Sequence, residues 1–505
     1  MQSKGAVLGL AFLLLAAGTA GCFGPGVARE ATPPTVADAP SETAATRRTV
    51  VHGTDGRVLP DSAYPGELPV LGQRMIPGAQ AREPMVAATH RGIYYDALVN
   101  MKTQVWGSRD QGLSWDPILR NPVANVVDGS GGYADPFLYA DPATDRLYSA
   151  ELFSTSCIIL EWSDGPDPAW DWSIIGDCTA NSHLHDHQSI VAAHPQDPMT
   201  KTTGYPNVLH YCASSYTATG APMARCSASF DGGRTFSSLT DTGLDHCTGL
   251  TGHLAASPSG TVFLPQVACS GPGKNVTAWV ALSRDDGRTW TPSLVDQRPA
   301  RGLAGPGPPH DGAVAADAAG NVYYYYLDAT QMPRLSISRD DGRTWAPSLD
   351  VSVPGVTGCA FPSIVAGDTG RIAMSCIGTT MAGGFRMADA DGPRATWNSY
   401  VTVSQDALAA QPVFATTTAN LPSDPLARGK PAAEGAVLLA SPVDSMGDFL
   451  KVTADPEGRI LLSLVDGCTL ACSDGGTQDS PRPGYAWAAV GVQTGGTGLR
   501  AAADP

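Results

Sequence analysis

The sequence predicts an all-β protein in which four-stranded sheets pack radially into a ring, the architecture of a β-propeller. One eight-residue turn, Ser-x-Asp-x-Gly-x-Thr/Ser-aromatic, occurs four times. A longer unit, a short apolar strand followed by a Gly-bearing turn and an aromatic or β-branched strand, starts seven times. The 56 glycines and 41 prolines separate short apolar runs, so almost no helix is expected.

The repeated turn has the residue types of a tight hairpin. Its Asp and Ser side chains can hydrogen bond to the backbone of the turn, Gly adopts a φ that other residues resist, and the aromatic ring covers the turn. The copies are Ser108–Trp115, Ser229–Phe236, Ser283–Trp290 and Ser338–Trp345. This unit resembles the Asp box of sialidases and related β-propellers. The resemblance implies a structural role at the periphery, between the third and fourth strands of a blade, for Asp110, Asp231, Asp285 and Asp340.

The longer unit sets the number of blades. A single four-stranded sheet cannot bury both faces, so successive copies must pack against one another. Seven starts favour seven blades, but the Pro-rich stretch 411–446 has weak periodicity and leaves six as the alternative. A strand near Thr49–His52 is expected to complete the last blade. The unit starts near Glu83, Asp135, Asp186, Gly252, Asp311, Phe361 and Gly447.

Two blades carry incomplete copies of the turn. The second blade has Ser163-Asp164-Gly165 followed by Trp170, and the sixth is expected to have its copy at 389–392, before Trp397. The last blade has none. The propeller is assigned to 48–498, with a tail at 499–505.

The N-terminal region predicts export. Lys4 precedes an apolar run that is too short to span a bilayer, and small residues follow, as in a secretory signal over 1–22. Cys22 after Ala-Gly resembles the lipidation site of a bacterial lipoprotein, with plain secretion as the alternative. Residues 23–47 are rich in Pro, Ala and Thr and are expected to form a flexible tether. The predicted location is the bacterial cell envelope.

The cysteines fit an exported protein. Cys22 is the odd one of eleven, and the other ten form five pairs of neighbours in which several flank a turn symmetrically, as partners in an antiparallel hairpin do. Metal-type CxxC spacing is absent. The predicted disulfides are Cys157–Cys178, Cys212–Cys226, Cys247–Cys269, Cys359–Cys376 and Cys468–Cys472.

Charge restricts the partners. The chain carries a formal charge of −16, which argues against nucleic acid and anionic membrane surfaces. Membrane contact is expected only through a lipid anchor. We expect a monomer that binds an extracellular glycan or a surface protein.

The centre of the ring is the predicted site. Innermost strands of a propeller all begin at one face, so the residues at their starts converge on a shared mouth, where ionisable groups gather. Second strands return to this face and add Asp96, Glu151, His210, Asp328 and Asp466. The alternative is that these residues satisfy loop amides. The first-strand candidates are Arg82, Glu83, Asp135, Asp186, His187, His253, His310, Asp311 and Asp448.

Arg82-Glu83-Pro84 stands where sialidases carry an Arg-Ile-Pro segment, so the resemblance implies that Arg82 binds a substrate carboxylate. Arg225 and Arg334 are the candidates for the two further arginines of that family. Glu83 departs from the family pattern, and no Tyr-Glu nucleophile pair or acid/base Asp is found. Glycoside cleavage needs a proton donor and a nucleophile, so a binding propeller is favoured over an exo-α-sialidase-type hydrolase.

No cofactor is predicted. His183, His185 and His187 would lie about 7 Å apart along one face of a strand, too far for a shared ion. A divalent cation that plugs the funnel stays as a weaker alternative.

Overall fold

The computed structural model describes residues 49–100, 102–118, 133–153, 157–165, 170–176, 184–216, 222–247, 250–270, 276–299, 311–382, 395–428, 450–469 and 486–505. The predicted signal, the tether, Cys22, His310 and Asp448 lie outside these residues. Within them the chain forms seven antiparallel sheets of four strands or more, with two 3-10 turns, η1 (Asp61–Ala63) and η6 (Ala501–Ala503). The all-β prediction with seven blades is confirmed.

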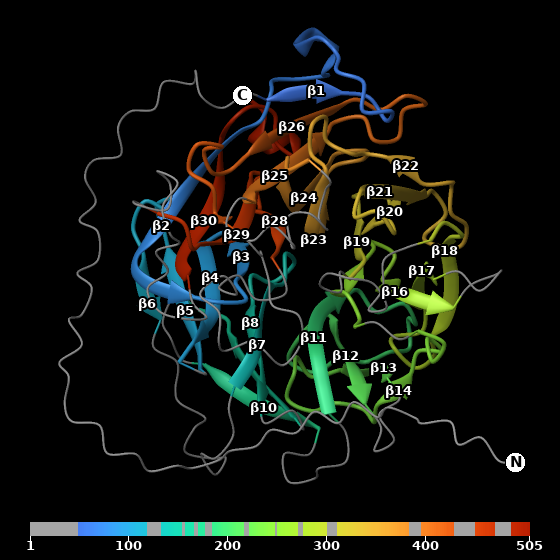
Figure 1. The fold of residues 1–505 in the computed structure, drawn as a ribbon. Helices are drawn as coiled ribbons and strands as arrows, with labels where there is room; N and C mark the ends of the chain where they lie inside the picture. The colour runs from blue at the N-terminus through green and yellow to red at the C-terminus, as the bar shows by residue number, and fades with distance from the viewer. Residues whose placement is uncertain are drawn as a thin grey trace, which may run out of the picture.

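Each of the first five blades is a meander that runs from the centre outwards (Figure 1). Blade one has β3 (Met85–Thr89), β4 (Gly92–Val99), β5 (Lys102–Ser108) and β6 (Asp116–Ile118). Blade two has β7 (Tyr133–Ala140), β8 (Leu147–Phe153), β9 (Cys157–Ser163) and β10 (Asp171–Gly176). Blade three has β11 (Leu184–Ala193), β12 (Val208–Tyr216), β13 (Pro222–Ser229) and β14 (Thr240–Asp241).

The remaining blades follow the same plan, with additions at the outer edges. Blade four has β15 (Ala255–Ala256), β16 (Val262–Ser270), β17 (Val276–Ser283) and β18 (Thr291–Asp296). Blade five has β19 (Ala313–Ala316), β20 (Val322–Leu327), β21 (Pro333–Ser338) and β22 (Leu349–Asp350). Blade six has β23 (Gly358–Ala366), β24 (Ile372–Thr379), β25 (Thr396–Ser404), β26 (Phe414–Thr418) and β27 (Ala427–Arg428). Blade seven has β28 (Val452–Ala454), β29 (Ile460–Asp466) and β30 (Ala486–Gly495).

The ring is closed by the N-terminal part of the chain. Successive innermost strands contact one another all the way round, and β28 of the last blade contacts β3 of the first. The fourth strand of blade seven is β2 (Val70–Ala81), which pairs with β30, whereas β1 (Val50–His52) pairs with β26 on the outside of blade six. The prediction that the strand near Thr49 completes the last blade is therefore wrong. Pro77 and Gly78 interrupt the alternation of buried and exposed residues along β2, so the sequence pattern did not predict this strand.

The incomplete turn of blade six is also in a different place. Trp397 lies within β25, the third strand, so 389–392 precede that strand instead of following it. The third strand ends at Ser404, whose hydroxyl donates to Asp406 Oδ1 at 3.0 Å. Ser404-x-Asp406 is thus the incomplete copy in this blade.

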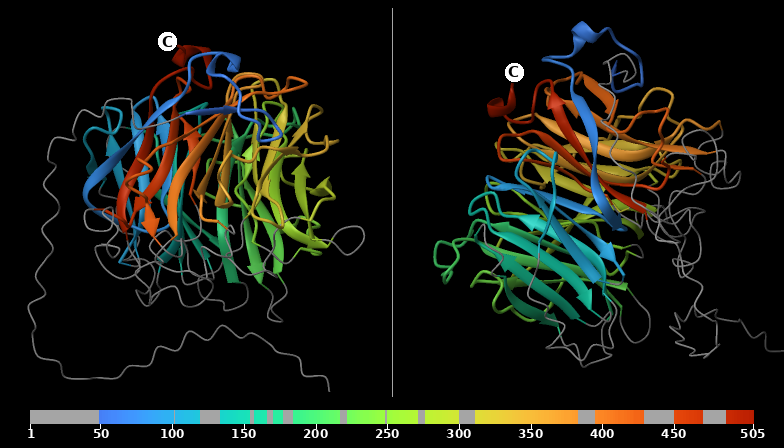
Figure 2. Two further views of the ribbon diagram at one scale, coloured as in Figure 1. Left: turned by 45° about the horizontal axis from the view of Figure 1, so that its top comes forward. Right: turned by 90° about the vertical axis from the view of Figure 1, so that its left-hand side faces the viewer.

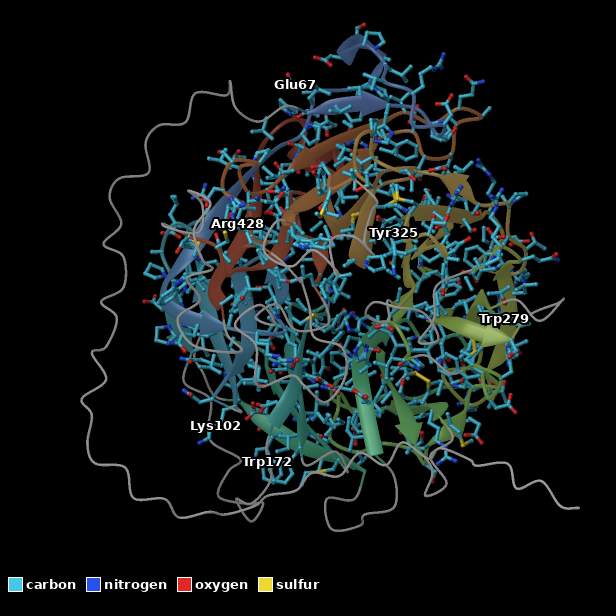
Figure 3. The ribbon with its side chains drawn as sticks, viewed as in Figure 1. Glu67, Lys102, Trp172, Trp279, Tyr325 and Arg428 are labelled. Atoms are coloured by element: carbon cyan, nitrogen blue, oxygen red, sulfur yellow. A yellow bond between two sulfur atoms is a disulfide. The ribbon has the colours of Figure 1, made fainter. Side chains whose placement is uncertain are left out.

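The core lies between the blades. Apolar side chains on facing sheets form separate clusters around the ring, and the largest joins blades six, seven and one. The sheets of the blades lie side by side around the ring (Figure 2). Side chains lie between neighbouring sheets (Figure 3). No helix among the described residues is both long and apolar enough to cross a membrane.

Three predicted disulfides are present among the described residues. Cys212–Cys226 and Cys359–Cys376 join neighbouring strands, and Cys247–Cys269 joins an isolated bridge residue to β16. Cys157 and Cys468 are also disulfide-bonded, and their predicted partners Cys178 and Cys472 lie outside the described residues. Disulfides of this number are typical of proteins from oxidising compartments.

Candidate functional site

The inner ends of four blades share a backbone irregularity. Glu83, Asp135, His187 and Phe361 all have a left-handed φ, between 46° and 55°. The pairing of the innermost strand shifts beside Asp135, His187 and Phe361, and three of the four residues precede a proline. Bulges of this kind re-aim side chains, and left-handed non-glycine residues persist only where surrounding contacts hold them. The bulges lie where the sequence places the mouth.

A chain of contacts links the first three blades. Arg82 Nε donates to Glu83 Oε1 at 3.0 Å, and both side chains are about 5% exposed. Glu83 Oε2 accepts the backbone N–H of Asp135 at 3.3 Å, and the amide of Gln188 donates to the Asp135 carbonyl. Three of the strained inner ends therefore brace one another.

Other contacts cross the centre between blades that are not neighbours. His187 Nδ1 of blade three lies 2.7 Å from Asp311 Oδ2 of blade five. The His187 ring stacks on His253 of blade four with centroids 6.4 Å apart, and His253 meets the edge of Phe137 of blade two at 4.9 Å. Closure of the propeller thus brings together three of the predicted residues, His187, His253 and Asp311, from blades three, four and five.

Lys451 completes this group. It precedes β28 in blade seven, and its Nζ donates to the Leu138 carbonyl of blade two at 2.9 Å and lies 4.9 Å from the centroid of the Phe137 ring. Burial lowers the pKa of Lys451 to about 8, although the charge of Asp96 opposes this shift. The sequence analysis missed Lys451, and its place directly before an innermost strand was the available signal. We call the set Arg82, Glu83, Phe137, His187, His253, Asp311 and Lys451 the hub cluster.

The remaining candidates lie around or away from the hub cluster. Asp96 is fully buried and pairs with Met85 of β3. Asp186 adjoins His187 and pairs with Ser214. His185, next in the predicted histidine run, has its Nδ1 2.7 Å from Tyr211 Oη, so it takes a different partner from His187.

The two further arginines are tied to outer strands. Arg225 Nε lies 2.8 Å from Asp241 Oδ1 on β14. Arg334 Nε lies 3.0 Å from Asp328 Oδ2, and its Nη1 lies 3.2 Å from Asp350 Oδ2 on β22. Because each arginine has an acidic partner on a fourth strand, the described contacts do not bring either one together with Arg82.

His210 and Asp466 lie outside the hub cluster. His210 lies near the start of β12, and a Cβ added to Gly287 in the third Ser-x-Asp turn would be 3.1 Å from its Nδ1. It is therefore at the opposite end of the blade from the mouth. Burial lowers its pKa to about 4. Asp466 ends β29 and accepts a hydrogen bond from the Gln73 amide of β2 at 2.6 Å.

The four Ser-x-Asp turns have one hydrogen-bond pattern. In each turn the Ser hydroxyl donates to the Asp carboxylate and accepts a hydrogen bond from the Gly N–H. The Thr or Ser two residues after the Gly donates both its N–H and its hydroxyl to the same Asp. Hydrogen bonds from Ser114 lower the pKa of Asp110 to about 2. All four turns join a third strand to a fourth, as predicted, at the far face from the mouth.

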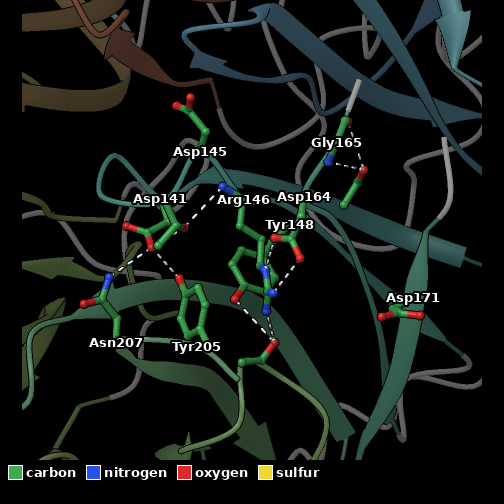
Figure 4. Close-up of polar contacts among 12 residues, drawn as sticks. Asp141, Asp145, Arg146, Tyr148, Asp164, Gly165, Asp171, Tyr205 and Asn207 are labelled. Atoms are coloured by element: carbon green, nitrogen blue, oxygen red, sulfur yellow. Dashed lines mark hydrogen bonds and ion pairs between the residues drawn. The ribbon is translucent and has the colours of Figure 1, made fainter. Parts of the chain in front are cut away.

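The incomplete turn of blade two is held by an arginine (Figure 4). Arg146 donates Nε and Nη2 to the two oxygens of Asp164 at 2.5 and 2.7 Å, and Nη1 to the Gly232 carbonyl of blade three at 3.1 Å. Its guanidinium lies 4.6 Å from the centroid of the Tyr205 ring. This network joins blades two and three at the far face, where it is structural.

One group has the spacing of metal ligands. His246, Cys247 and Cys269 offer ligand atoms within 4.8 Å of one another, and no other such group occurs among the described residues. The two cysteines form a disulfide, so their sulfur atoms are not thiolate ligands.

Known proteins resemble this chain in structure at low sequence identity. No protein-family model matches the chain, and no curated protein matches it in sequence. Among solved structures, a protein of unknown function from Dyadobacter fermentans aligns over 85% of this chain and 98% of its own, at 13% identity and TM-score 0.40. The intramolecular trans-sialidase of Ruminococcus gnavus covers 77% and 90% at 14% identity and TM-score 0.37. The α-L-arabinofuranosidase Arb93A of Fusarium graminearum covers 70% and 97% at 12% identity and TM-score 0.40.

The sheet topology therefore defines the class: the chain is a seven-bladed β-propeller. Identities this low concern the fold alone and say nothing of the reaction or ligand.

Proposed function

We propose that this protein is an exported β-propeller that binds a glycan through the hub cluster. The observation that carries the proposal is the set of contacts across the centre, His187 to Asp311 and Lys451 to Leu138. Together with the hydrogen bond from Asp135 to Glu83 and the ring contacts of His253, they connect polar and aromatic groups from six blades. A few fixed polar groups beside aromatic rings are the usual chemistry of a small-molecule site.

The charges of the hub favour a neutral, hydroxyl-rich ligand. Among the described residues at or beside the hub, the cations are Arg82 and Lys451. Arg82 already has Glu83 as its counter-charge at 3.0 Å. The carboxylates there are Glu83, Asp96, Asp135, Asp186 and Asp311. These carboxylates would repel an anionic ligand. The hydroxyls of a neutral sugar can instead donate hydrogen bonds to carboxylates and accept them from histidine.

A sialidase-type hydrolase is the alternative. The buried position of Arg82 at the inner end of blade one favours it, since this is where the family resemblance places a carboxylate-binding arginine. The ion pairs of Arg225 with Asp241 on β14 and of Arg334 with Asp350 on β22 argue against it, because they hold both arginines at outer strands. The four Ser-x-Asp turns, which we propose are Asp boxes, serve either function.

The test is a glycan array with the protein lacking residues 1–47, followed by calorimetry on the best neutral ligand. Asp311→Asn and His187→Ala should each weaken binding at least tenfold while the thermal unfolding midpoint stays within a few degrees. Release of 4-methylumbelliferone from its sialoside, lost in Arg82→Ala, would instead establish the hydrolase. Binding that is unchanged in both hub variants would overturn the proposal.

Export with a lipid anchor at Cys22 is part of the proposal. The disulfides among the described residues support an oxidising compartment. Metabolic labelling with palmitate in a bacterial host should mark the full chain and not Cys22→Ser. Label at equal levels in both would contradict lipidation at this residue.

A further inference from the structure

We propose a second carbohydrate site, outside the hub, that takes a neutral oligosaccharide in a groove between the last blade and the first. The groove has a volume of about 420 Å³, within the range of about 300–1,000 Å³ for small-molecule sites. Its walls come from β2 of blade seven and from β4, β5 and β6 of blade one. None of these is an innermost strand, so the groove lies at the periphery.

A bulge in the ring-closing strand forms one wall. Between Met75, opposite Ala489, and Gln80, opposite Trp487, four residues of β2 face a single residue of β30. Ile76 and Ala79 are buried in the core, while the Pro77-Gly78 tip is exposed. Gly78 has φ 71°, and a Cβ there would meet nothing within 4 Å, so the backbone conformation and not space requires glycine. Ile76 and Ala79 thus hold this wall of the groove against the core.

Two tryptophans line the groove, and Trp115 provides most of the exposed aromatic surface. Trp106 is 6% exposed and Trp115 is partly exposed. Both rings contact the fully buried Tyr95, with centroids 5.9 and 6.4 Å away, and the Tyr95 hydroxyl donates to the Leu464 carbonyl at 2.9 Å. Trp115 Nε1 donates to the Gly112 carbonyl at 3.1 Å, which fixes the ring against its own turn. A rigid aromatic surface loses little entropy when a ligand binds.

The chemistry of the lining points to an uncharged sugar. None of the eleven lining residues is ionisable, in a chain of which 16% is charged. Three of them, Gln80, Asn100 and Gln104, carry amides that can both donate and accept. A pyranose or furanose ring presents an apolar face of C–H groups, which suits an indole, and hydroxyls at its edge, which suit amides. An anionic or cationic ligand would have no counter-charge here.

The experiment uses the folded propeller with 5-fluorotryptophan incorporated and follows ¹⁹F NMR signals. The chain has ten tryptophans, and Trp106→Phe and Trp115→Phe assign the two groove signals. The probes are maltohexaose, cellohexaose, xylohexaose, mannohexaose, chitohexaose and arabinohexaose. At least one of them should shift both groove signals in a saturable way.

Matched variants decide whether binding occurs in the groove. Trp115→Ala and Gln104→Ala should each raise the Kd at least tenfold. Trp345→Ala changes the equivalent position of another turn and should leave the Kd within twofold, as should the hub variant Asp311→Asn. If Trp115→Ala lowers stability, Gln104→Ala still tests the groove, because it leaves the indole in place.

The two proposed sites fail in different ways. Loss of binding in Asp311→Asn with full binding in Trp115→Ala and Gln104→Ala would overturn the groove and support the hub. No shift of either groove signal by any probe at millimolar concentration would also overturn the groove. Hub binding on the glycan array would be unaffected by that result.

Discussion

The hub cluster and the Ser-x-Asp turns are two polar networks at opposite faces of one propeller, and they are assembled differently. Each turn is closed within eight residues, for example from Ser283 to Trp290, and the same hydrogen bonds recur in four blades. The hub joins residues as far apart as Leu138 and Lys451 through contacts that occur once each. A repeated local unit tolerates change in one copy, whereas a single connected cluster does not.

The largest effect is expected from breaking the ion pair at the hub. Glu83→Gln removes the carboxylate that lies 3.0 Å from the buried Arg82 guanidinium and should lower the free energy of unfolding by about 3 kcal/mol. Urea unfolding measures it. Asp55→Asn, in a pair that is more than 60% exposed on both sides, should change stability by less than about 0.5 kcal/mol and is the control. Equal small losses in both variants would show that the hub pair is dispensable.

The hub lysine should give the next largest effect, as a pH dependence. Because the pKa of Lys451 is lowered to about 8 in the folded state, below its usual 10.5, the native state releases this proton first as pH rises. The free energy of unfolding should therefore gain about 1–2 kcal/mol between pH 8 and 9.5 relative to Lys451→Met. Lys102→Met, which changes an exposed lysine, should follow the wild type. Parallel curves for wild type and Lys451→Met would contradict the assignment.

The turns should respond individually and additively. Asp285→Ala removes the acceptor of two Thr289 hydrogen bonds and should cost about 1–2 kcal/mol, and Asp231→Ala should cost the same within about 0.5 kcal/mol. The double variant should lose the sum, since the two carboxylates accept hydrogen bonds from different residues. Arg288 of one turn lies 5.9 Å from the Phe230 ring of the other, but neither carboxylate takes part in that contact. A coupling above about 1 kcal/mol would mean that the turns are not independent units.

Acid should weaken the turns by a smaller, graded amount. Burial raises the pKa of Asp340, but hydrogen bonds from Thr344 outweigh it and bring the pKa to about 2. A carboxyl group with a depressed folded pKa stabilises the fold above its unfolded pKa of about 4, and this contribution is lost as pH falls towards 2. The urea midpoint of Asp340→Asn should therefore fall less steeply than that of the wild type between pH 4 and 2. Identical slopes would contradict this.

Much of the fold could be predicted because the repeat is local. The turns, the seven blades and the pairs Cys212–Cys226, Cys247–Cys269 and Cys359–Cys376 all follow from neighbours along the chain. Ring closure by β2 could not be read, since its partner β30 is some 400 residues away and its own alternation is broken at Pro77-Gly78. His210 was predicted at the end of a second strand, at the mouth, but it lies near the start of β12. The bounds of this strand depend on its pairing with β11 and β13, which the local sequence does not show.

The amino-acid sequence by itself determined the all-β class, the turn chemistry and the set of ionisable residues at the inner ends of the blades, because each depends on residues within one hairpin. Only the tertiary structure decided which of them meet. His187 reaches Asp311, and Lys451 reaches Phe137 and Leu138, because closing the ring places distant strands around one axis. The groove beside Trp106 and Trp115 exists for the same reason, since its opposite wall is the strand that closes the ring.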